Sequence, residues 1–347
     1  MLTTSNTRYA KEGKFEELKR FEDFLRATHN HESTIFEFFK TFSKPIAVPR
    51  CFYAVKFNEE NQARGHMALE YVPNSTVKSL YECLTVEQVT EIARGLGKIQ
   101  ALAHFHGIGQ KKLKTEKRDD MYTTYWSNFW INAMEKLFRE LCEHDQSTEF
   151  AALIDRILTI APEYVGANLQ VTLFEQLGQT PVLVHGDLWN GNVLLDAETG
   201  RLLSIIDWGV AHLGSPSEDI LRILMTGMTS SGRRNNSANI LDVMFQSLEE
   251  HLDGQPAPYT KDQLTHSFEL LFPHAAFFAV PMIVFVTKHF VVVANLFSQR
   301  TDITSEHLAV IMDKIRGILE DIVEYHGNNA EETSKLQWKQ PDFGFRI

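Results

Sequence analysis

Apolar residues recur at helical spacing along most of the 347-residue chain. The first such segment, from Phe15 to Phe39, predicts two helices that are broken near the polar triplet 28–30. A capping box formed by Thr85 and Gln88 marks the start of a later helix. We expect the remaining helices at Tyr122–Phe138, at Glu149–Leu177 as a pair, at Leu270–Thr287 and at Thr304–Tyr325, with a loose polar tail after His326.

Strand-like segments are few and short. Val48–Phe57 and Gly65–Val72 are joined by a polar turn, and the second of them ends at Pro73-Asn74. Further along, the apolar runs Val193–Leu195 and Leu202–Ile206 flank polar turn residues, which predicts a β-hairpin. This balance of elements predicts an α+β chain that is mostly helical.

The hairpin should bring three polar side chains together. In an antiparallel hairpin each strand retraces the other, so Asn192 and Asp207 should lie side by side at its open end, with Asp187 on the loop just before it. Two carboxylates at such close range repel unless a cation lies between them. Carboxylate and amide oxygens are ligands that hold Mg²⁺ beside substrate phosphates. A lone Asp is often only a turn former, but that alternative does not explain the joint spacing.

The joint pattern contains the parts of the kinase catalytic template: an Asp that takes the hydroxyl proton, an Asn five positions later and a metal-binding Asp. The chain reads H-G-D-L-W-N-G-N from His185 and I-I-D-W-G up to Gly209. These residues resemble the catalytic segment of the aminoglycoside phosphotransferase and choline kinase superfamily. The resemblance is strongest to its choline-kinase-like (CHK) group, which includes the ecdysteroid-kinase-like proteins, and it extends from about His29 to about Phe297.

The resemblance implies a two-lobed, protein-kinase-like α+β fold with a reduced N-lobe at residues 1–73 and a large helical C-lobe at residues 74–347. It also implies that Asp187 is the catalytic base and that Asn192 and Asp207 bind Mg²⁺. We therefore expect ATP and Mg²⁺ as cofactors.

Further expectations concern the part of the N-lobe that contacts the phosphates of ATP. By resemblance, Glu32 is the helix glutamate that pairs with a strand lysine, and the alternative is an acidic residue favoured by a helix N-terminus. In a complete lobe the strands with the phosphate-covering loop and that lysine precede this helix, and residues 1–28 leave no room for them. Lys56 follows the helix, and we interpret it as a solvated strand residue. We therefore expect an N-lobe that lacks its first strands.

The resemblance also implies a hinge that binds adenine through its backbone, with Glu70, Tyr71 and Val72 as candidates. The alternative for this segment is an edge strand that ends in a turn. Asp219 matches the family position whose carboxylate hydrogen-bonds the catalytic loop, and the alternative is a carboxylate that satisfies free N–H groups at a helix start.

The net charge and the cysteine content indicate which partners and which cellular compartment to expect. A net charge of −11 without a block of Lys and Arg argues against a nucleic-acid partner. Three widely spaced cysteines form neither a disulfide framework nor a metal cluster, and we expect a reducing, cytoplasmic setting without a signal peptide. Leu270–Thr287 approaches the length of a membrane span, but Pro273 and Pro281 interrupt it, so a buried helix is favoured. We expect a flexible loop at Thr226–Asn239, with Arg233 and Arg234 solvated rather than bound to an anion.

The predicted function is Mg²⁺-ATP-dependent transfer of a phosphoryl group to a hydroxyl of a small metabolite. The alternative is a pseudokinase, a nucleotide-binding or interaction module without transfer, because the N-lobe is incomplete. A protein kinase is disfavoured, because no Ala-Pro-Glu segment follows Asp207 and no length of chain remains for a peptide-docking loop. The identity of the acceptor and the oligomeric state stay open.

Overall fold

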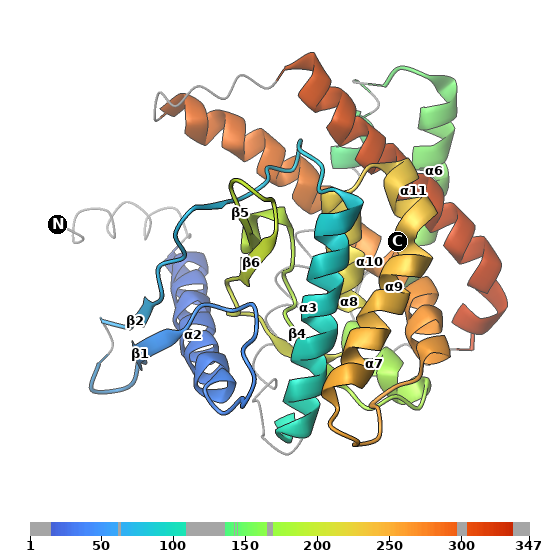
Figure 1. The fold of residues 1–347 in the computed structure, drawn as a ribbon. Coiled ribbons are helices and arrows are strands. Elements are labelled where there is room, and N and C mark those ends of the chain that lie inside the picture. The colour runs from blue at the N-terminus through green and yellow to red at the C-terminus, as the bar shows by residue number, and fades with distance from the viewer. Residues whose placement is uncertain are drawn as a thin grey trace.

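A computed structural model describes residues 15–61, 64–108, 136–141, 143, 145–164, 169–296 and 304–335. The N-terminal part contains the long helix α2 (Phe15–Phe39) and an antiparallel pair of strands, β1 (Cys51–Val55) and β2 (His66–Leu69). Figure 1 shows these elements (blue) on one side of the molecule and a mass of helices on the other. The α+β class predicted from the sequence is confirmed.

Helix α2 is continuous, so the predicted break at residues 28–30 is wrong. The polar residues at this point bond outward to the end of β1 instead of interrupting the helix. His29 Nε2 lies 2.9 Å from the carbonyl oxygen of Val55. The Asn30 amide donates to the carbonyl of Phe57 (2.8 Å) and accepts from its N–H (2.7 Å). Tertiary bonds therefore compensate for the weak helix propensity of this segment.

The rest of the described chain is mainly helical, and two predictions there are confirmed. The capping box of Thr85 and Gln88 is present, and the pair expected at Glu149–Leu177 is formed by two helices. The helix expected at Tyr122–Phe138 lies almost wholly outside the described residues. The helices are α3 (Val86–Phe105), α6 (Thr148–Tyr164), α7 (Leu169–Gln176), α8 (Glu218–Gly227), α9 (Ser230–His251), α10 (Lys261–Leu296) and α11 (Ser305–Thr333).

Two small antiparallel sheets carry the catalytic motif. Strand β4 (Val182–Val184) pairs with β7 (His212–Gly214). Strand β5 (Val193–Asp196) lies between β3 (Ser75–Thr76) and β6 (Leu202–Ile205). The hairpin β5–β6 lies between the N-terminal elements and the helices in Figure 1. The loop from β4 to β5, which contains the H-G-D motif, is therefore fixed at both ends by strands.

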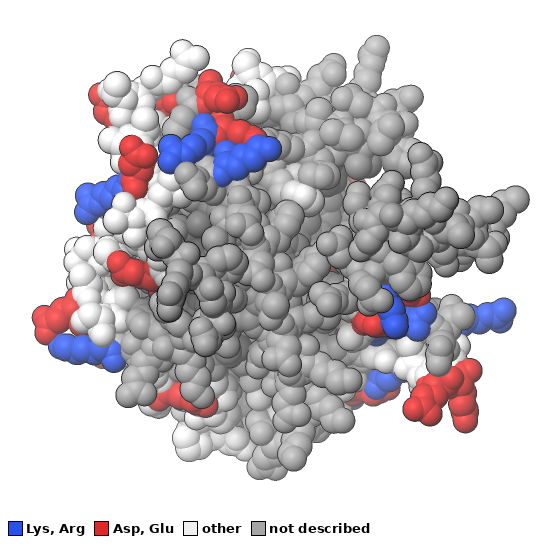
Figure 2. All heavy atoms as spheres, turned by 180° about the vertical axis from the view of Figure 1, so that it is seen from behind, with Lys and Arg blue, Asp and Glu red and all other residues white. Residues whose placement is uncertain are grey.

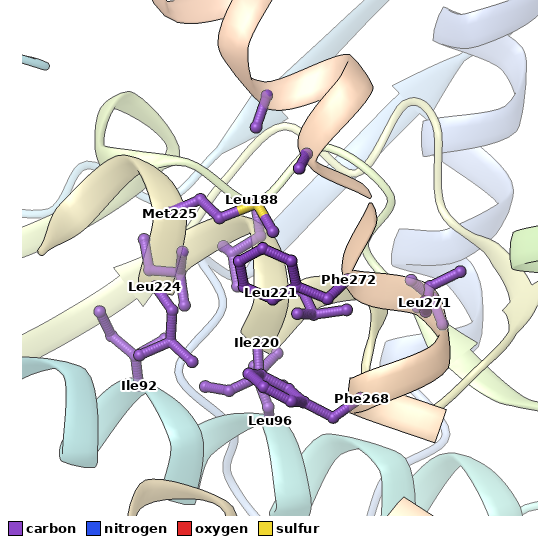
Figure 3. Packing of buried hydrophobic residues seen from close by; sticks show 14 of the residues in the cluster. Ile92, Leu96, Leu188, Ile220, Leu221, Leu224, Met225, Phe268, Leu271 and Phe272 are labelled. Atoms are coloured by element: carbon purple, nitrogen blue, oxygen red, sulfur yellow. The ribbon is translucent and has the colours of Figure 1, made fainter. Parts of the chain in front are cut away.

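Helix α8 is the centre of the helical core. Its residues Ile220, Leu221 and Leu224 are fully buried. Figure 3 shows the side chains of α8 packed against apolar side chains from α3, α10 and the catalytic loop. The labelled members of this cluster are Ile92, Leu96, Leu188, Ile220, Leu221, Leu224, Met225, Phe268, Leu271 and Phe272. A helix enclosed in this way has little freedom to shift, because protein interiors are close-packed.

The flexible loop predicted at Thr226–Asn239 is wrong, because α9 begins within it. The hydroxyl of Thr229 caps this helix by accepting the N–H of Gly232 at 3.1 Å. The prediction of solvated arginines is also wrong for Arg233, which is 1% exposed and forms an ion pair with Asp321 of α11. The polar run forms a helix because its charges face a partner helix rather than water.

Helix α10 contains the apolar run that approaches the length of a membrane span. Within the described residues, Lys261–Thr287 meets the length and composition of a membrane-crossing helix, yet 67% of its apolar window is buried inside the protein. This burial favours the predicted core helix. Helix α11 continues to Thr333, so the loose tail predicted after His326 is wrong up to that residue, and residues 336–347 lie outside the described part of the chain.

Charges of both signs are interspersed on the described part of the surface. On the face shown in Figure 2, the described Lys and Arg side chains lie beside Asp and Glu and form no extended basic area. This distribution agrees with the acidic net charge.

Candidate active site

The catalytic loop is held in place by hydrogen bonds to α8. The carboxylate of Asp219 accepts the N–H of His185 at 2.7 Å and the N–H of Gly186 at 3.0 Å. Burial raises the pKa of Asp219 to about 6, and the attraction of His185 and these two N–H groups opposes that rise. The prediction that Asp219 hydrogen-bonds this loop is confirmed. It lies in the first turn of α8, as its alternative interpretation also required.

Asp187 projects from the anchored loop and remains partly open to solvent. Its side chain is 37% exposed, and the guanidinium Nη1 of Arg222 lies 3.6 Å from its Oδ1. The amide Nδ2 of Asn192 donates to the backbone carbonyl of Asp187 at 2.8 Å. This bond closes the loop, and because it uses the nitrogen of the Asn192 side chain it leaves the amide oxygen facing elsewhere as an acceptor.

Asp207 lies one residue beyond its predicted position in the hairpin. The N–H of Ile206 donates to the carbonyl of Asn192 at 3.0 Å, so Asn192 aligns with Ile206 and not with Asp207. The pairing of Leu195 with Leu202 beside the turn already differs from the predicted register, and the irregularity between Leu194 and Leu195 removes only part of that difference. Asp207 has a φ of 65°, a left-handed conformation that costs a residue other than glycine about 1–3 kcal/mol. The backbone thus turns sharply at this carboxylate.

The structure brings the carboxylates of Asp187 and Asp207 within electrostatic range. Burial raises the pKa of Asp207, and the charge of Asp187 raises it further. The N–H of Gly209 lowers it. A divalent cation between them would relieve this repulsion. The carboxylate of Asp207 and the amide oxygen of Asn192 are hard oxygen donors of the kind that fits Mg²⁺.

Glu32 also belongs to this site. Its Oε1 accepts the N–H of Trp208, the residue after Asp207, at 3.0 Å. Burial raises the pKa of Glu32 to about 7, the charge of Asp207 adds to that rise, and the Trp208 N–H reduces it. Lys56 forms a surface ion pair with Glu37 at 2.9 Å, as expected of a solvated lysine. No described lysine forms an ion pair with Glu32, so the glutamate–lysine pair is absent from the described part of the chain.

Trp208 joins three parts of the site. It is fully buried, and its indole N–H donates to the carbonyl of Ile205 at 3.0 Å. Its ring packs edge-on against Phe39 of α2, with ring centroids 4.8 Å apart, and lies tilted against His185, with centroids 4.6 Å apart. The ring therefore ties α2, the hairpin and the catalytic loop together. The motif predicts the position of Trp208 in the sequence but none of these contacts.

The three hinge candidates directly follow β2. The N–H of Glu70 donates to Arg50 and its carboxylate accepts the N–H of Arg50. The carbonyl of Val72 accepts the Ser75 hydroxyl at 2.9 Å. Tyr71 is 84% exposed. Of the three hinge candidates, Tyr71 has the backbone that these bonds leave open to a ligand.

A buried lysine that sequence reasoning missed supports the loop from the other side. Lys314 of α11 is 0% exposed and donates to the carbonyls of Leu80 (2.8 Å), Glu82 (3.0 Å) and Thr226 (2.7 Å). The same segment, residues 79–84, receives Asn190 of the catalytic loop, whose amide donates to Ser79 at 3.2 Å. Burial lowers the pKa of Lys314 to about 8, so the ammonium form still predominates at pH 7. We call this contact region the 79–84 junction.

The raised pKa of Glu32 predicts a stability that falls as the pH rises. Because the native state holds this proton more tightly than the unfolded chain, the stabilisation is complete below about pH 4.5 and is lost as the pH rises through about 7. Glu32→Gln keeps the acceptor for the Trp208 N–H and removes the titration. We expect the variant to be more stable than the wild type by about 2 kcal/mol at pH 8 and equally stable at pH 4.5. Urea unfolding at both pH values measures the difference.

The matched control is Glu37→Gln, which removes an exposed carboxylate from the same helix. It should leave the difference between the two pH values as it is in the wild type. A Glu32→Gln variant with the same stability relative to wild type at both pH values would contradict the assignment.

Comparison with known proteins places the chain in a family. The model of the family DUF1679, described as "Uncharacterized oxidoreductase dhs-27", matches residues 1–330. The Caenorhabditis elegans "Uncharacterized kinase-like protein D1044.1" is 26% identical over 261 residues, which are 72% of this chain and 64% of that protein. The chain thus matches a little under two thirds of the length of this relative.

Solved structures with a similar fold include one candidate and one named small-molecule kinase. A candidate aminoglycoside phosphotransferase from Ralstonia eutropha is 13% identical, with a TM-score of 0.44 over 87% of this chain and 84% of that one. Choline kinase from Cryptosporidium parvum is 11% identical, with a TM-score of 0.39 over 83% and 75%.

The chain belongs to the DUF1679 family, and its resemblance to the choline-kinase-like group of the aminoglycoside phosphotransferase superfamily is confirmed. The kinase-like α+β class expected from that resemblance is confirmed with it. Within this kinase-like class, the predicted roles of the individual site residues stay predictions.

Proposed function

We propose that the protein transfers the γ-phosphoryl group of ATP to a hydroxyl group of a small molecule. The single observation that carries the proposal is that Asn192 closes the loop behind Asp187 while the charge of Asp187 acts on Asp207 and raises its pKa. In this proposal Asp187 accepts the proton of the acceptor hydroxyl as its oxygen attacks phosphorus, and ADP leaves.

Asn192 and Asp207 would hold Mg²⁺ through their side-chain oxygens. When bound, the ion would neutralise charge on the phosphates of ATP. The contribution of the chain itself is geometric: Asp219 fixes the backbone before Asp187, and Asn192 closes the loop behind it. Tyr71, whose backbone takes part in none of the bonds described above, is the part of the hinge that we assign to adenine. The kinase-like name of the relative and the small-molecule kinases of similar fold agree with this proposal.

Calorimetric titration with a non-hydrolysable ATP analogue, with and without Mg²⁺, tests the proposal. We expect binding that depends on Mg²⁺. Asp207→Asn should weaken that binding at least about 10-fold, a loss that even outer-shell partners of a metal cause. Asp262→Asn, at the exposed start of α10, is the matched control and should bind as the wild type does. Folded wild-type protein that binds no analogue would contradict the proposal.

A pseudokinase is the second candidate, and one observation favours it. Glu32 accepts the N–H of Trp208, and no described lysine pairs with it. A protein that binds the ATP analogue but releases no ADP in the presence of Mg²⁺ would fit this function. ADP release that rises when hydroxylated acceptors are added would exclude it.

The word oxidoreductase in the description of the family raises a third class. A dinucleotide-binding enzyme would carry a glycine-rich turn between a parallel strand and a helix. In the described chain the sheets are antiparallel, and the pair Gly95 and Gly97 lies inside α3. A side chain at Gly97 would collide with the backbone of Met244 in α9, so this glycine serves helix packing. The geometry therefore favours phosphoryl transfer over hydride transfer.

A further inference from the structure

Helix α8 presents two charged side chains to the catalytic loop. Asp219 and Arg222 are three residues apart and so lie on one face of the helix. Asp219 accepts the N–H groups of His185 and Gly186, while Arg222 lies 3.6 Å from the carboxylate of Asp187. One turn of α8 thus contacts the backbone of two consecutive loop residues and the side chain of the third.

The pair of Arg222 and Asp187 differs from an ordinary surface ion pair. The Arg222 side chain is only 15% exposed, and its helix is held in place by the buried neighbours Leu221 and Ile223. The distance of 3.6 Å exceeds the roughly 2.7–2.9 Å of a closed charge-assisted hydrogen bond. The guanidinium therefore attracts the carboxylate of Asp187 at the distance of an ion pair rather than of a closed hydrogen bond.

The attraction between Arg222 and Asp187 acts beside further carboxylates of the same site. Glu32 accepts the N–H of Trp208, the residue after Asp207, and the amide of Asn192 donates to the backbone carbonyl of Asp187. We refer to the carboxylates of Asp187, Asp207 and Glu32 as the carboxylate row of the site. The loop from His185 to Asn192 contains no Lys or Arg. Among the ion pairs of the described residues, that of Arg222 is the one that reaches this row, from a different element of the chain.

We propose that Arg222 is a positioning residue for Asp187, holding its carboxylate toward the acceptor and supplying the counter-charge that this row of carboxylates needs. The inference rests on the proposed function, because it assigns a role in transfer to a residue that need not touch substrate. A merely structural arginine would hold α8 in place and leave metal affinity and turnover unaffected.

The test is a titration of the full chain with Mn²⁺, followed by the signal of free Mn²⁺ in electron paramagnetic resonance. Arg222→Gln removes a positive charge close to the carboxylates, so Mn²⁺ should bind about 3- to 10-fold more tightly. Arg222→Lys keeps the charge and should bind as the wild type does, within about 2-fold. Lys56→Gln removes a cation at the surface ion pair with Glu37 and is the matched control. A merely structural loss would weaken Mn²⁺ binding or leave it unchanged.

A second measurement keeps the proposal falsifiable if Arg222→Gln does not fold. Lys cannot reproduce the planar reach of a guanidinium, so Arg222→Lys should lower kcat for ADP release from Mg-ATP about 3- to 10-fold, with KM for Mg-ATP within about 2-fold of wild type. Wild-type protein that binds no Mn²⁺ would overturn the proposed function and this inference with it. Wild-type binding with no tightening in folded Arg222→Gln, or an unchanged kcat in Arg222→Lys, would overturn the inference alone.

Discussion

Asp187→Asn is expected to abolish phosphoryl transfer while leaving the fold intact. On the proposed function, Asp187 takes the proton of the attacking hydroxyl, and an amide cannot accept it at neutral pH. Loss of a general base typically lowers turnover by about 10²- to 10⁴-fold. The amide keeps the size of the side chain, and the loop bonds to Asp219 and Asn192 use backbone atoms of residues 185–187. ADP release from Mg-ATP with added acceptors measures the loss.

The matched control for this variant is Glu198→Gln. It removes an exposed carboxylate from the turn of the same hairpin and should keep wild-type turnover. Unfolding by urea should be the same for all three proteins. An Asp187→Asn variant that retains full turnover would exclude Asp187 as the base.

Lys314→Met is expected to destabilise the protein by about 3 kcal/mol. Methionine has a similar length but no donor, so the carbonyls of Leu80, Glu82 and Thr226 would remain buried without the ammonium. Each buried polar group that loses its partner costs about 1–3 kcal/mol, and removal of the buried charge offsets part of that loss. Urea unfolding at pH 7 measures the difference in the free energy of unfolding.

Lys335→Met tests whether the loss is specific to the buried site. Lys335 lies just beyond α11 and pairs only with Glu331, with 69% of its side chain exposed. Such a pair contributes little, so this change should alter the free energy of unfolding by less than about 0.5 kcal/mol. Equal effects of the two substitutions would contradict the role assigned to the 79–84 junction.

Local signals in the sequence predicted much of the fold, and they failed where polar residues have distant partners. The capping box before α3 and the catalytic hairpin depend on residues close in sequence, and both were foreseen. The break expected in α2 was wrong because the partners of Asn30 are the backbone groups of Phe57. The start of α9 was missed because Arg233 is neutralised by Asp321, which is far along the chain.

The chemistry of the candidate site was predictable, but its supports were not. The spacing of Asp187 and Asn192 depends on one loop, whereas Arg222 enters from another helix. Lys314 left a signal that could have found it: it lies three residues after Ile311 and one before Ile315, inside the buried stripe of α11. A lysine in an apolar stripe is more often paired in the interior than solvated.

The position of Lys314 also bears on the order in which the protein matures during synthesis. The 79–84 junction and the catalytic loop leave the ribosome long before α11, which carries the donor for their buried carbonyls. A nascent chain that ends before α11 would therefore hold these carbonyls without that donor. The 79–84 junction should thus acquire its final geometry only when the last described helix docks.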